Sequence, residues 1–416
     1  MPASVENQQF GTSRRGTITD QALAGIKVLD ISGTVATAYC GKLFADYGAD
    51  VIDVEPPDGG FSTRQLAPHV AGVHDPERSA MHSYLSANKH SVTLDVTQQT
   101  GRAMFLSLAA DADVVLEGAK PGWLAEIGLD LDALQTAAPN VVLSSITWFG
   151  QTGPYAQYAG TDSVCHALIG MVRGIGPVEG PPVLPSGYQA QITAGLTAYI
   201  GTMGQVVARE LGNVSGATRL DTSIFEANLC FTDVGAVGGY FSGTTARRMG
   251  VNRFPPTYPL GIYPCKDGWL GVTALTPSQW KSFCKLLDLD IADEPQYQTT
   301  LGRLKDAPQM DSVIAERVRE KSADELFNKG QQMRVPLALV PTMEQIFTID
   351  QFVERNAFAD IHHPDQGAFA SPVTPFRLFK TPPRFGGDAP RLGAATQSAL
   401  ALSDDRFDAL RAEGVI

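Results

Sequence analysis

Cysteine is scarce in this sequence. Only five occur among 416 residues, and no two of them form a Cys-x-x-Cys pair. An odd number of scattered cysteines excludes the dense disulfide framework of small secreted domains and indicates free thiols in a reducing compartment. The cysteines are Cys40, Cys165, Cys230, Cys265 and Cys284.

Long apolar runs are also absent. No stretch reaches the roughly 20 residues that a helix needs to span a bilayer. The polar segment 1–20 lacks the apolar core of a signal peptide. We therefore expect a cytoplasmic protein with no membrane-spanning segment.

Basic residues are fewer than acidic residues. The chain has 32 Lys and Arg residues against 44 Asp and Glu residues, a formal net charge of 32 − 44 = −12. This balance argues against a nucleic-acid-binding surface or a polybasic membrane surface, although it leaves room for a local basic pocket. Apolar residues make up 44% and charged residues 18%, which is typical of a globular chain with a large buried core.

Several catalytic signatures are missing. Gly33 and Gly41 are too widely spaced for the G-x-G-x-x-G turn of a dinucleotide fold, and no P-loop sequence occurs. No nucleophile elbow supports Ser-His-Asp catalysis. The pair His362-His363 is interpreted as a polar turn, so we expect no metal site.

Strand and helix patterns alternate through the first part of the chain. Residues 26–31 predict a buried strand, residues 39–47 a helix, and residues 50–54 the next strand. A strand–helix–strand unit of this kind begins an open parallel sheet. Further strands are predicted at 91–96, 113–116 and 140–147, and further helices at 101–110 and 131–137. The pattern predicts a doubly wound α/β domain.

The composition then changes. Residues 150–191 are rich in glycine and proline, which indicates a functional loop or a linker. Residues 192–211 predict a long helix packed through small residues. A hairpin turning at Asp267-Gly268, followed by helices at 277–287 and 310–320, indicates a second, smaller domain. Phe241, Phe254 and Tyr258 indicate an apolar or aromatic pocket. We divide the chain into a large domain from 24–211, a small domain from 220–325, and a C-terminal return to the large domain from 335–416, with a strand at 335–340 and a helix at 406–412.

Two lysines stand beside predicted strands. Lys89 leads into the strand at 91–96, and Lys120 follows the strand at 113–116. Open α/β sheets bind ligands at strand ends, where a lysine can meet a phosphate as a point charge. Ordinary solvated lysines remain the alternative interpretation.

An ordered set of motifs carries a family resemblance. The chain resembles the family III CoA-transferases, the group that includes formyl-CoA transferase, carnitine CoA-transferase and α-methylacyl-CoA racemase. The resemblance extends over about residues 24–400. The motifs are Val28-Leu29-Asp30, residues 44–52, residues 88–95, residues 113–117, residues 149–154 and Pro390-Arg391-Leu392-Gly393.

The resemblance implies a Rossmann-like large domain built from both chain ends, a smaller α+β domain, and two subunits that interlock like rings. It implies that CoA lies on the large domain near Lys89, Leu94 and Lys120. Coenzyme A and its acyl thioesters would be substrates, with no permanently bound cofactor and a carboxylic acid as acceptor. In such transferases an aspartate attacks the thioester as a covalent nucleophile.

This sequence departs from the family at the nucleophile. The aspartate precedes a small-residue helix, and an alignment anchored on residues 180–182 and Gly195 places Gln191 at its position. An amide has no anionic oxygen with which to form the acyl anhydride. Asp162 matches a position where the family often carries an acidic residue. A racemase would also need a histidine where this chain has Thr161.

Two functional hypotheses follow. In the first, the chain is the non-nucleophilic subunit of a heterodimeric CoA-transferase, paired with a paralogue that keeps the aspartate, as the resemblance to benzylsuccinate CoA-transferase implies. In the second, it forms a homodimer that binds acyl-CoA or uses altered chemistry through Asp162.

Overall fold

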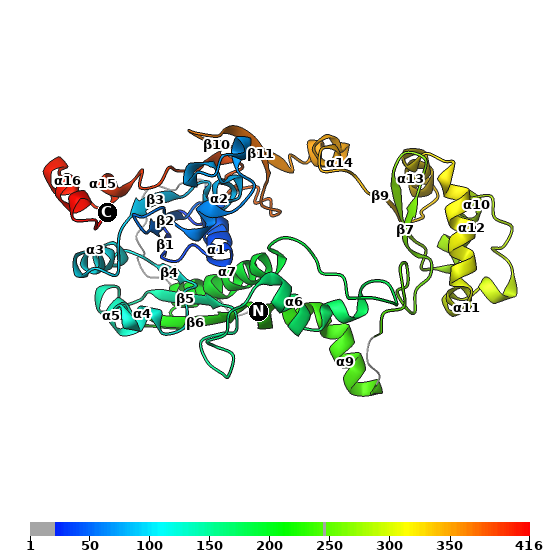
Figure 1. The fold of residues 1–416 in the computed structure, drawn as a ribbon, viewed down its shortest axis with the longest axis horizontal. Coiled ribbons are helices and arrows are strands. Elements are labelled where there is room, and N and C mark those ends of the chain that lie inside the picture. The colour runs from blue at the N-terminus through cyan, green and yellow to red at the C-terminus, as the bar shows by residue number, and fades with distance from the viewer. Residues whose placement is uncertain (1–20, 244–246) are drawn as a thin grey trace, which may run out of the picture. The chain divides into compact units, whose positions relative to one another are not determined.

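The computed structural model describes residues 21–243 and 247–416. The chain folds into two compact units (Figure 1). The large unit contains the described residues up to Ala159, then Gln191–Ile224 and Phe358–Ile416. The small unit contains Gly160–Ala190 and Phe225–Ala357.

A six-stranded sheet with all strand pairs parallel forms the centre of the large unit. The strand order is β3-β2-β1-β4-β5-β6, so the chain moves outward from β1 in one direction and then from β4 in the other. This is the Rossmann order, in which ligands bind outside the carboxyl ends of the strands, where the direction reverses. The strands are β1 (Lys27–Asp30), β2 (Asp50–Glu55), β3 (His90–Thr93), β4 (Val114–Glu117), β5 (Val142–Thr147) and β6 (Thr218–Ser223).

One face of this sheet is covered by an apolar layer. Leu29, Val115 and Leu143 of the strands pack with Phe105 and Leu134 of the helices. Alternate residues of a strand point to opposite faces, so Asp30, Asp53 and Glu55 point to the other side. The helices of the large unit are α1 (Val35–Asp46), α2 (Ala80–Ser86), α3 (Gln99–Ala109), α4 (Trp123–Glu126), α5 (Leu131–Ala137), α7 (Gln189–Glu210), α15 (Thr396–Ala399) and α16 (Asp404–Ala412).

The second face carries buried ion pairs beneath α1 and α2. Arg64 binds Glu55 through two nitrogens, at 2.7 and 2.8 Å, and both side chains are fully buried. Lys89 Nζ lies 3.2 Å from Asp53 Oδ1. Removing one partner of such a pair leaves an uncompensated buried charge.

Helices α1 and α7 approach closely because Gly195 has no side chain. A Cβ atom at Gly195 would lie 2.5 Å from the carbonyl oxygen of Ala36, well inside contact distance. One turn further along α7, the Tyr199 ring meets Phe44 edge-on, with centroids 4.8 Å apart. The two helices therefore run side by side in the same direction.

The C-terminal segment returns to the large unit. Its strands β10 (Phe358–His363), β11 (Gly367–Pro372) and β12 (Gly387–Asp388) form a three-stranded sheet. The Ala395 amide donates to the carbonyl of Ser91 in edge strand β3. Val415 and Ile416 enter the apolar layer. Both chain ends thus build the large unit, and the predicted α/β, Rossmann-like fold is confirmed.

The small unit has its own core around Trp280, Phe283 and Ile314. An antiparallel sheet in the order β7-β8-β9 contributes Leu270 and Leu337 to this core. Its elements are α6 (Asp162–Leu168), α9 (Asp233–Ser242), β7 (Leu260–Pro264), β8 (Trp269–Thr273), α10 (Pro277–Leu286), α11 (Thr300–Lys305), α12 (Ala307–Arg319), α13 (Ala323–Gln332), β9 (Leu337–Leu339) and α14 (Asp350–Glu354), with α8 (Ile224–Ala227) beginning at the unit boundary.

The units divide the chain differently from the ranges 24–211, 220–325 and 335–416. Strand β6 pairs with β5, so the large unit continues to Ile224. Strand β9 pairs with β8, which keeps residues 335–340 in the small unit, and the return begins at Phe358. Strand β6 carries no apolar signal in the sequence, because its first four residues alternate half-buried and exposed side chains, several of them polar.

The structure also corrects two predictions about single segments, the start of helix α1 and the role of Tyr258. Helix α1 begins at Val35 instead of residue 39, because the Thr34 side chain caps it by accepting from the Thr37 amide. Tyr258 is fully buried, and its hydroxyl donates to Asp311 Oδ1 at 2.7 Å, so it belongs to the core of the small unit and not to a pocket. In the part of the chain described, no helix combines the length and the apolar character needed to cross a bilayer.

The close approach at Gly195 generates a stability prediction. Gly195→Ala should destabilise the protein by about 1–3 kcal/mol, because the new methyl group overlaps the Ala36 carbonyl and forces α7 away from α1. Gly204→Ala is the matched control in the same helix, since a Cβ there meets no atom within 4 Å. It should be neutral or stabilising by up to about 1 kcal/mol. Urea unfolding measures both, and equal effects would contradict the packing argument.

The buried Glu55–Arg64 pair generates a pH prediction. The bonds from Arg64 lower the pKa of Glu55 from 4.5 to about 2. A carboxyl group with a lowered pKa stabilises the fold above its unfolded pKa, and this contribution is lost as the pH falls from about 4.5 toward 2. The double variant Glu55→Gln/Arg64→Met should therefore lose stability less steeply across this range. Glu126→Gln, at an exposed glutamate, should keep the wild-type slope in thermal melts between pH 2.5 and 6.

Candidate active site

Gln191 lies in the first turn of α7 and is half-buried. Four residues later Gly195 contacts the first turns of α1, and α1 starts directly beyond the carboxyl end of β1. Because α1 and α7 run in the same direction, their amino-terminal ends lie at the same edge of the sheet. Gln191 therefore stands at the edge where open α/β sheets bind ligands.

The residue before Gln191 is held through both of its backbone groups. Within the small unit, the Ala190 amide donates to Asp162 Oδ1 at 2.9 Å, and the Ala190 carbonyl accepts from Asn228 Nδ2 at 3.0 Å. Asp162 thus satisfies one of the amides that a helix leaves unpaired at its start. Asn228 is fully buried, and no sequence pattern had drawn attention to it. The two contacts fix the backbone turn that carries position 191.

Backbone atoms line the point where the strand order reverses. Asp30 Oδ1 accepts from the amides of Ser32 and Gly33, at 3.1 and 3.0 Å, which turns the chain after β1. Beyond β4, the Gly118 amide donates to Ser32 Oγ at 2.6 Å. A Cβ at Gly118 would lie 2.9 Å from both Ile146 O and Thr34 Oγ1. The crevice between β1 and β4 is therefore closed tightly at Gly118.

The three residues expected near CoA are placed differently from one another. Lys89 precedes β3, at the amino end of that strand, and its buried amine donates to the carbonyl of Ala38 and to Asp53. Leu94 is buried in the apolar layer. Lys120 follows β4 and is exposed. Of the three, only Lys120 presents its charge at the carboxyl edge, because the long side chain of Lys89 turns inward.

Burial controls the charge state around Lys89. Loss of hydration raises the pKa of Asp53 to about 7, although the nearby Lys89 ammonium lowers it. Burial also raises the pKa of Asp30, again opposed by Lys89. One lysine therefore faces two buried carboxyl groups, and this cluster stabilises the packing of α1 on the sheet without reaching solvent.

A second polar network links the end of β4 and the turn after β5 to Arg219 and Asp221 within β6, and the sequence did not reveal it. Arg219 donates to Gln151 Oε1 at 2.5 Å and to Ser145 Oγ, and its Nη2 lies 3.7 Å from Glu117 Oε1. The Asp221 carboxylate accepts from the Gln151 amide at 3.0 Å. Burial raises the pKa of Glu117. The network holds the turn after β5 in place.

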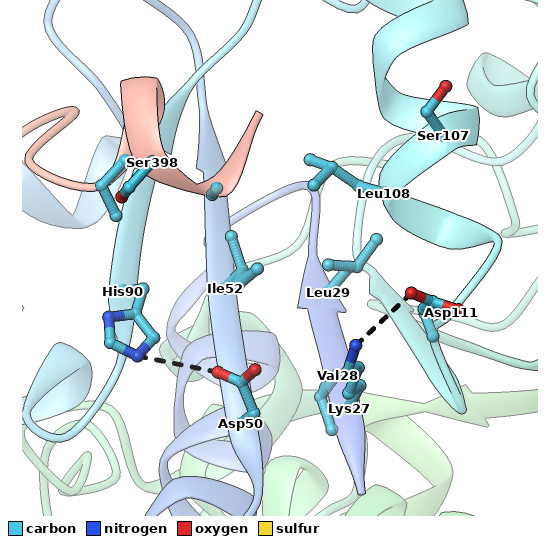
Figure 2. A pocket seen from close by; sticks show the side chains of 13 residues that line it. Lys27, Val28, Leu29, Asp50, Ile52, His90, Ser107, Leu108, Asp111 and Ser398 are labelled. Atoms are coloured by element: carbon cyan, nitrogen blue, oxygen red, sulfur yellow. Dashed lines mark hydrogen bonds and ion pairs between the residues drawn. The ribbon is translucent and has the colours of Figure 1, made fainter. Parts of the chain in front are cut away.

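A cavity of about 410 Å³ opens at the opposite, amino edge of the sheet. Figure 2 shows its charged side chains paired across it: Lys27 with Asp111 at 3.5 Å and His90 with Asp50 at 3.6 Å. Its other wall comes from α3 and α15. Because the charged side chains described in its wall are paired with one another, we assign no part of the reaction to this cavity.

One cluster has the composition of a metal site. The ligand atoms of Glu77, His363 and Asp365 lie within 4.8 Å of one another. However, the His363 Nδ1 atom accepts from the Asp365 amide, so the neutral ring carries its proton on Nε2, which faces Glu77 at 3.2 Å. Arg391 forms two bonds to Asp365, and Arg64 binds Glu77. These contacts fit an ion-pair network better than a metal centre.

Comparisons with known proteins agree with this geometry. The chain is 28% identical over 383 residues to a succinate–glutarate CoA-transferase of Agrobacterium fabrum, covering 91% of this chain and 95% of the relative. It is 29% identical over 418 residues to the succinyl-CoA–L-malate CoA-transferase alpha subunit of Chloroflexus aurantiacus, covering 97% of this chain and 95% of that subunit.

Structural comparison gives the same result. A CAIB/BAIF family protein from Brucella suis superposes with a TM-score of 0.81 at 26% identity, over 95% of this chain and all of that chain. The model of CoA-transferase family III matches residues 23–396. The resemblance predicted from the sequence is confirmed, and the chain belongs to CoA-transferase family III.

Proposed function

We propose that this chain is the non-nucleophilic subunit of a heterodimeric CoA-transferase, which moves CoA from an acyl-CoA donor to a carboxylic acid acceptor. The observation that carries the proposal is Gln191 at the start of α7, within surroundings that still hold that position. Within the large unit, the close contact of Gly195 with Ala36 supports the proposal, because it holds the turn of α7 that carries Gln191.

The chemistry explains why a partner is needed. In the covalent route, a carboxylate oxygen attacks the thioester carbonyl, the C–S bond breaks, and CoA leaves as the thiolate from an acyl anhydride. Gln191 has a neutral amide in place of the carboxylate, on a side chain one methylene longer than that of aspartate, although it still donates hydrogen bonds. A paralogue that carries the aspartate would supply this step.

This chain contributes a binding surface at the carboxyl edge of its sheet. We assign Lys120 to the phosphates of CoA, because its charge is exposed directly after β4. Lys89 and Leu94 are buried, so we assign them a role in packing the sheet and not in direct contact with CoA. The N-terminal turn of α7, which carries Gln191, lies at the same edge.

The exposed apolar side of α7 supports the proposal that a second subunit packs against this chain. Leu196, Ile200 and Val207 recur at helical spacing along this 22-residue helix, Leu211 follows its last residue, and Ile200 is 63% exposed. An apolar stripe of this length is typical of a surface that another chain covers. One relative is itself named an alpha subunit.

A second candidate function rests on Asp162. Its carboxylate is one hydrogen bond from the residue that precedes position 191. In a homodimer it would act as the nucleophile in place of the missing aspartate. Asp162 also has a structural role in this position, because it caps the first turn of α7.

The composition of the isolated assembly tests the main proposal. Native mass spectrometry of the untagged protein from its own host should give a mass that requires a second, different polypeptide beside the 44.4 kDa chain. A species near twice 44.4 kDa with full transferase activity would refute the heterodimer.

Restoring the carboxylate tests the role of position 191. The isolated wild-type chain should form no covalent acyl adduct with acyl-CoA, whereas Gln191→Asp should become acylated and sensitive to hydroxylamine. Gln191→Asn is the matched control, because it has the shorter side chain without the charge. Intact-protein mass spectrometry reads the adduct. A wild-type adduct would contradict the proposal.

The Asp162 alternative has its own test. If Asp162 only caps α7, Asp162→Asn should keep any transferase activity of the assembly within about threefold and keep the melting temperature, because the asparagine oxygen can still accept from the Ala190 amide and asparagine caps as well as aspartate. If Asp162 is the nucleophile, the same variant should lose turnover by several orders of magnitude without a comparable loss of stability.

A further inference from the structure

The turn after β5 presents an aromatic cluster at the carboxyl edge. Tyr155 and Tyr158 stack with ring centroids 4.8 Å apart and an angle of 19° between their planes. Phe149 meets both rings edge-on, at 5.8 and 6.5 Å. The tyrosines remain 47% and 60% exposed. We call Phe149, Tyr155 and Tyr158 the aromatic platform.

The platform stands on a segment that is fixed at two places. Its beginning is held where Gln151 bonds to Asp221 and Arg219. Its end is held where Gln157, between the two tyrosines, donates to the Pro121 carbonyl at 3.1 Å. A segment fixed in advance loses little conformational entropy when a ligand binds. The rings are therefore presented as a preformed surface.

Positive charge lies beside the platform in a protein of net charge −12. Lys120 precedes Pro121, whose carbonyl accepts the hydrogen bond from Gln157 in the segment that carries the platform. Arg219 is 40% exposed, and its bonds to described residues use Nε and Nη2. Gln151, which it binds, is two residues from Phe149, a span of at most about 7 Å. An exposed aromatic face beside two cations fits an anionic molecule that carries a flat ring.

We propose that the aromatic platform binds an aromatic ring in the acyl group of the substrate, so that this subunit selects aromatic acids and their CoA thioesters. The inference rests on the proposed function and specifies its substrate class. Stacked and edge-on rings gain about 0.5–1.5 kcal/mol beyond the area they bury. That range corresponds to a preference of about two- to twelvefold for a ring over an aliphatic group of equal size.

Two thioesters that differ only in aromaticity provide the test. Phenylacetyl-CoA and cyclohexylacetyl-CoA have the same charge and nearly the same size, and calorimetry on the assembly as isolated gives both dissociation constants. The wild type should prefer the phenyl compound by about two- to twelvefold. The double variant Tyr155→Leu/Tyr158→Leu should lose this preference, whereas Tyr155→Phe/Tyr158→Phe should keep it. Tyr240→Leu, at an exposed tyrosine of α9, should behave like the wild type.

The adenine of CoA is the other ring that could stack on the tyrosines. If the leucine variant weakens both thioesters and free CoA equally, but not phenylacetyl-pantetheine, the platform binds adenine and the proposal is overturned. Equal affinities of the wild type for the two thioesters would also overturn it. Either result leaves the acylation test at position 191 unaffected, so failure of this inference is separable from failure of the proposed function.

Discussion

The contact between Gly195 and Ala36 is the constraint on which the site depends. It brings the backbone of α7 against α1, and a methyl group would already be too large for the space. Because α1 starts at the end of β1, this contact fixes how far α7 extends beyond the sheet. Within the large unit, this backbone contact therefore sets where the turn of α7 that carries residue 191 lies.

Contacts made by the backbone explain how a nucleophilic side chain can be replaced while the structure around it is kept. Asp162 and Asn228 hold the backbone of Ala190 through its amide and its carbonyl. A glutamine, one methylene longer than aspartate, can then occupy the place of the carboxylate. Under the proposed function, a chain of this kind keeps the architecture that a paired subunit needs and leaves the covalent step to its paralogue.

The sequence predicted the elements that apolar periodicity defines and failed where polar residues determine the structure. Strands β1 to β5 contain buried apolar residues and overlap the predicted strands, whereas β6 carries Arg219 and Asp221 and was missed. Lys89 was interpreted as a surface cation, but Gly41 leaves room for its amine beneath α1. Asn228 donates a hydrogen bond to Ala190, a residue far from its own segment, which no local pattern encodes. Position 191 was identified because the alignment was anchored on residues 180–182 and Gly195.

The polar residues that the sequence could not place share one arrangement. Glu117 ends β4, Gln151 follows β5, and Arg219 and Asp221 lie within β6, so residues from three neighbouring parallel strands meet. Their bonds stabilise the turn that carries the aromatic platform. In a parallel sheet, all strands deliver their last residues to one edge, so a side chain there can be fixed by residues distant in sequence. The strand order therefore determines which side chains meet at this edge, and no single sequence motif does so.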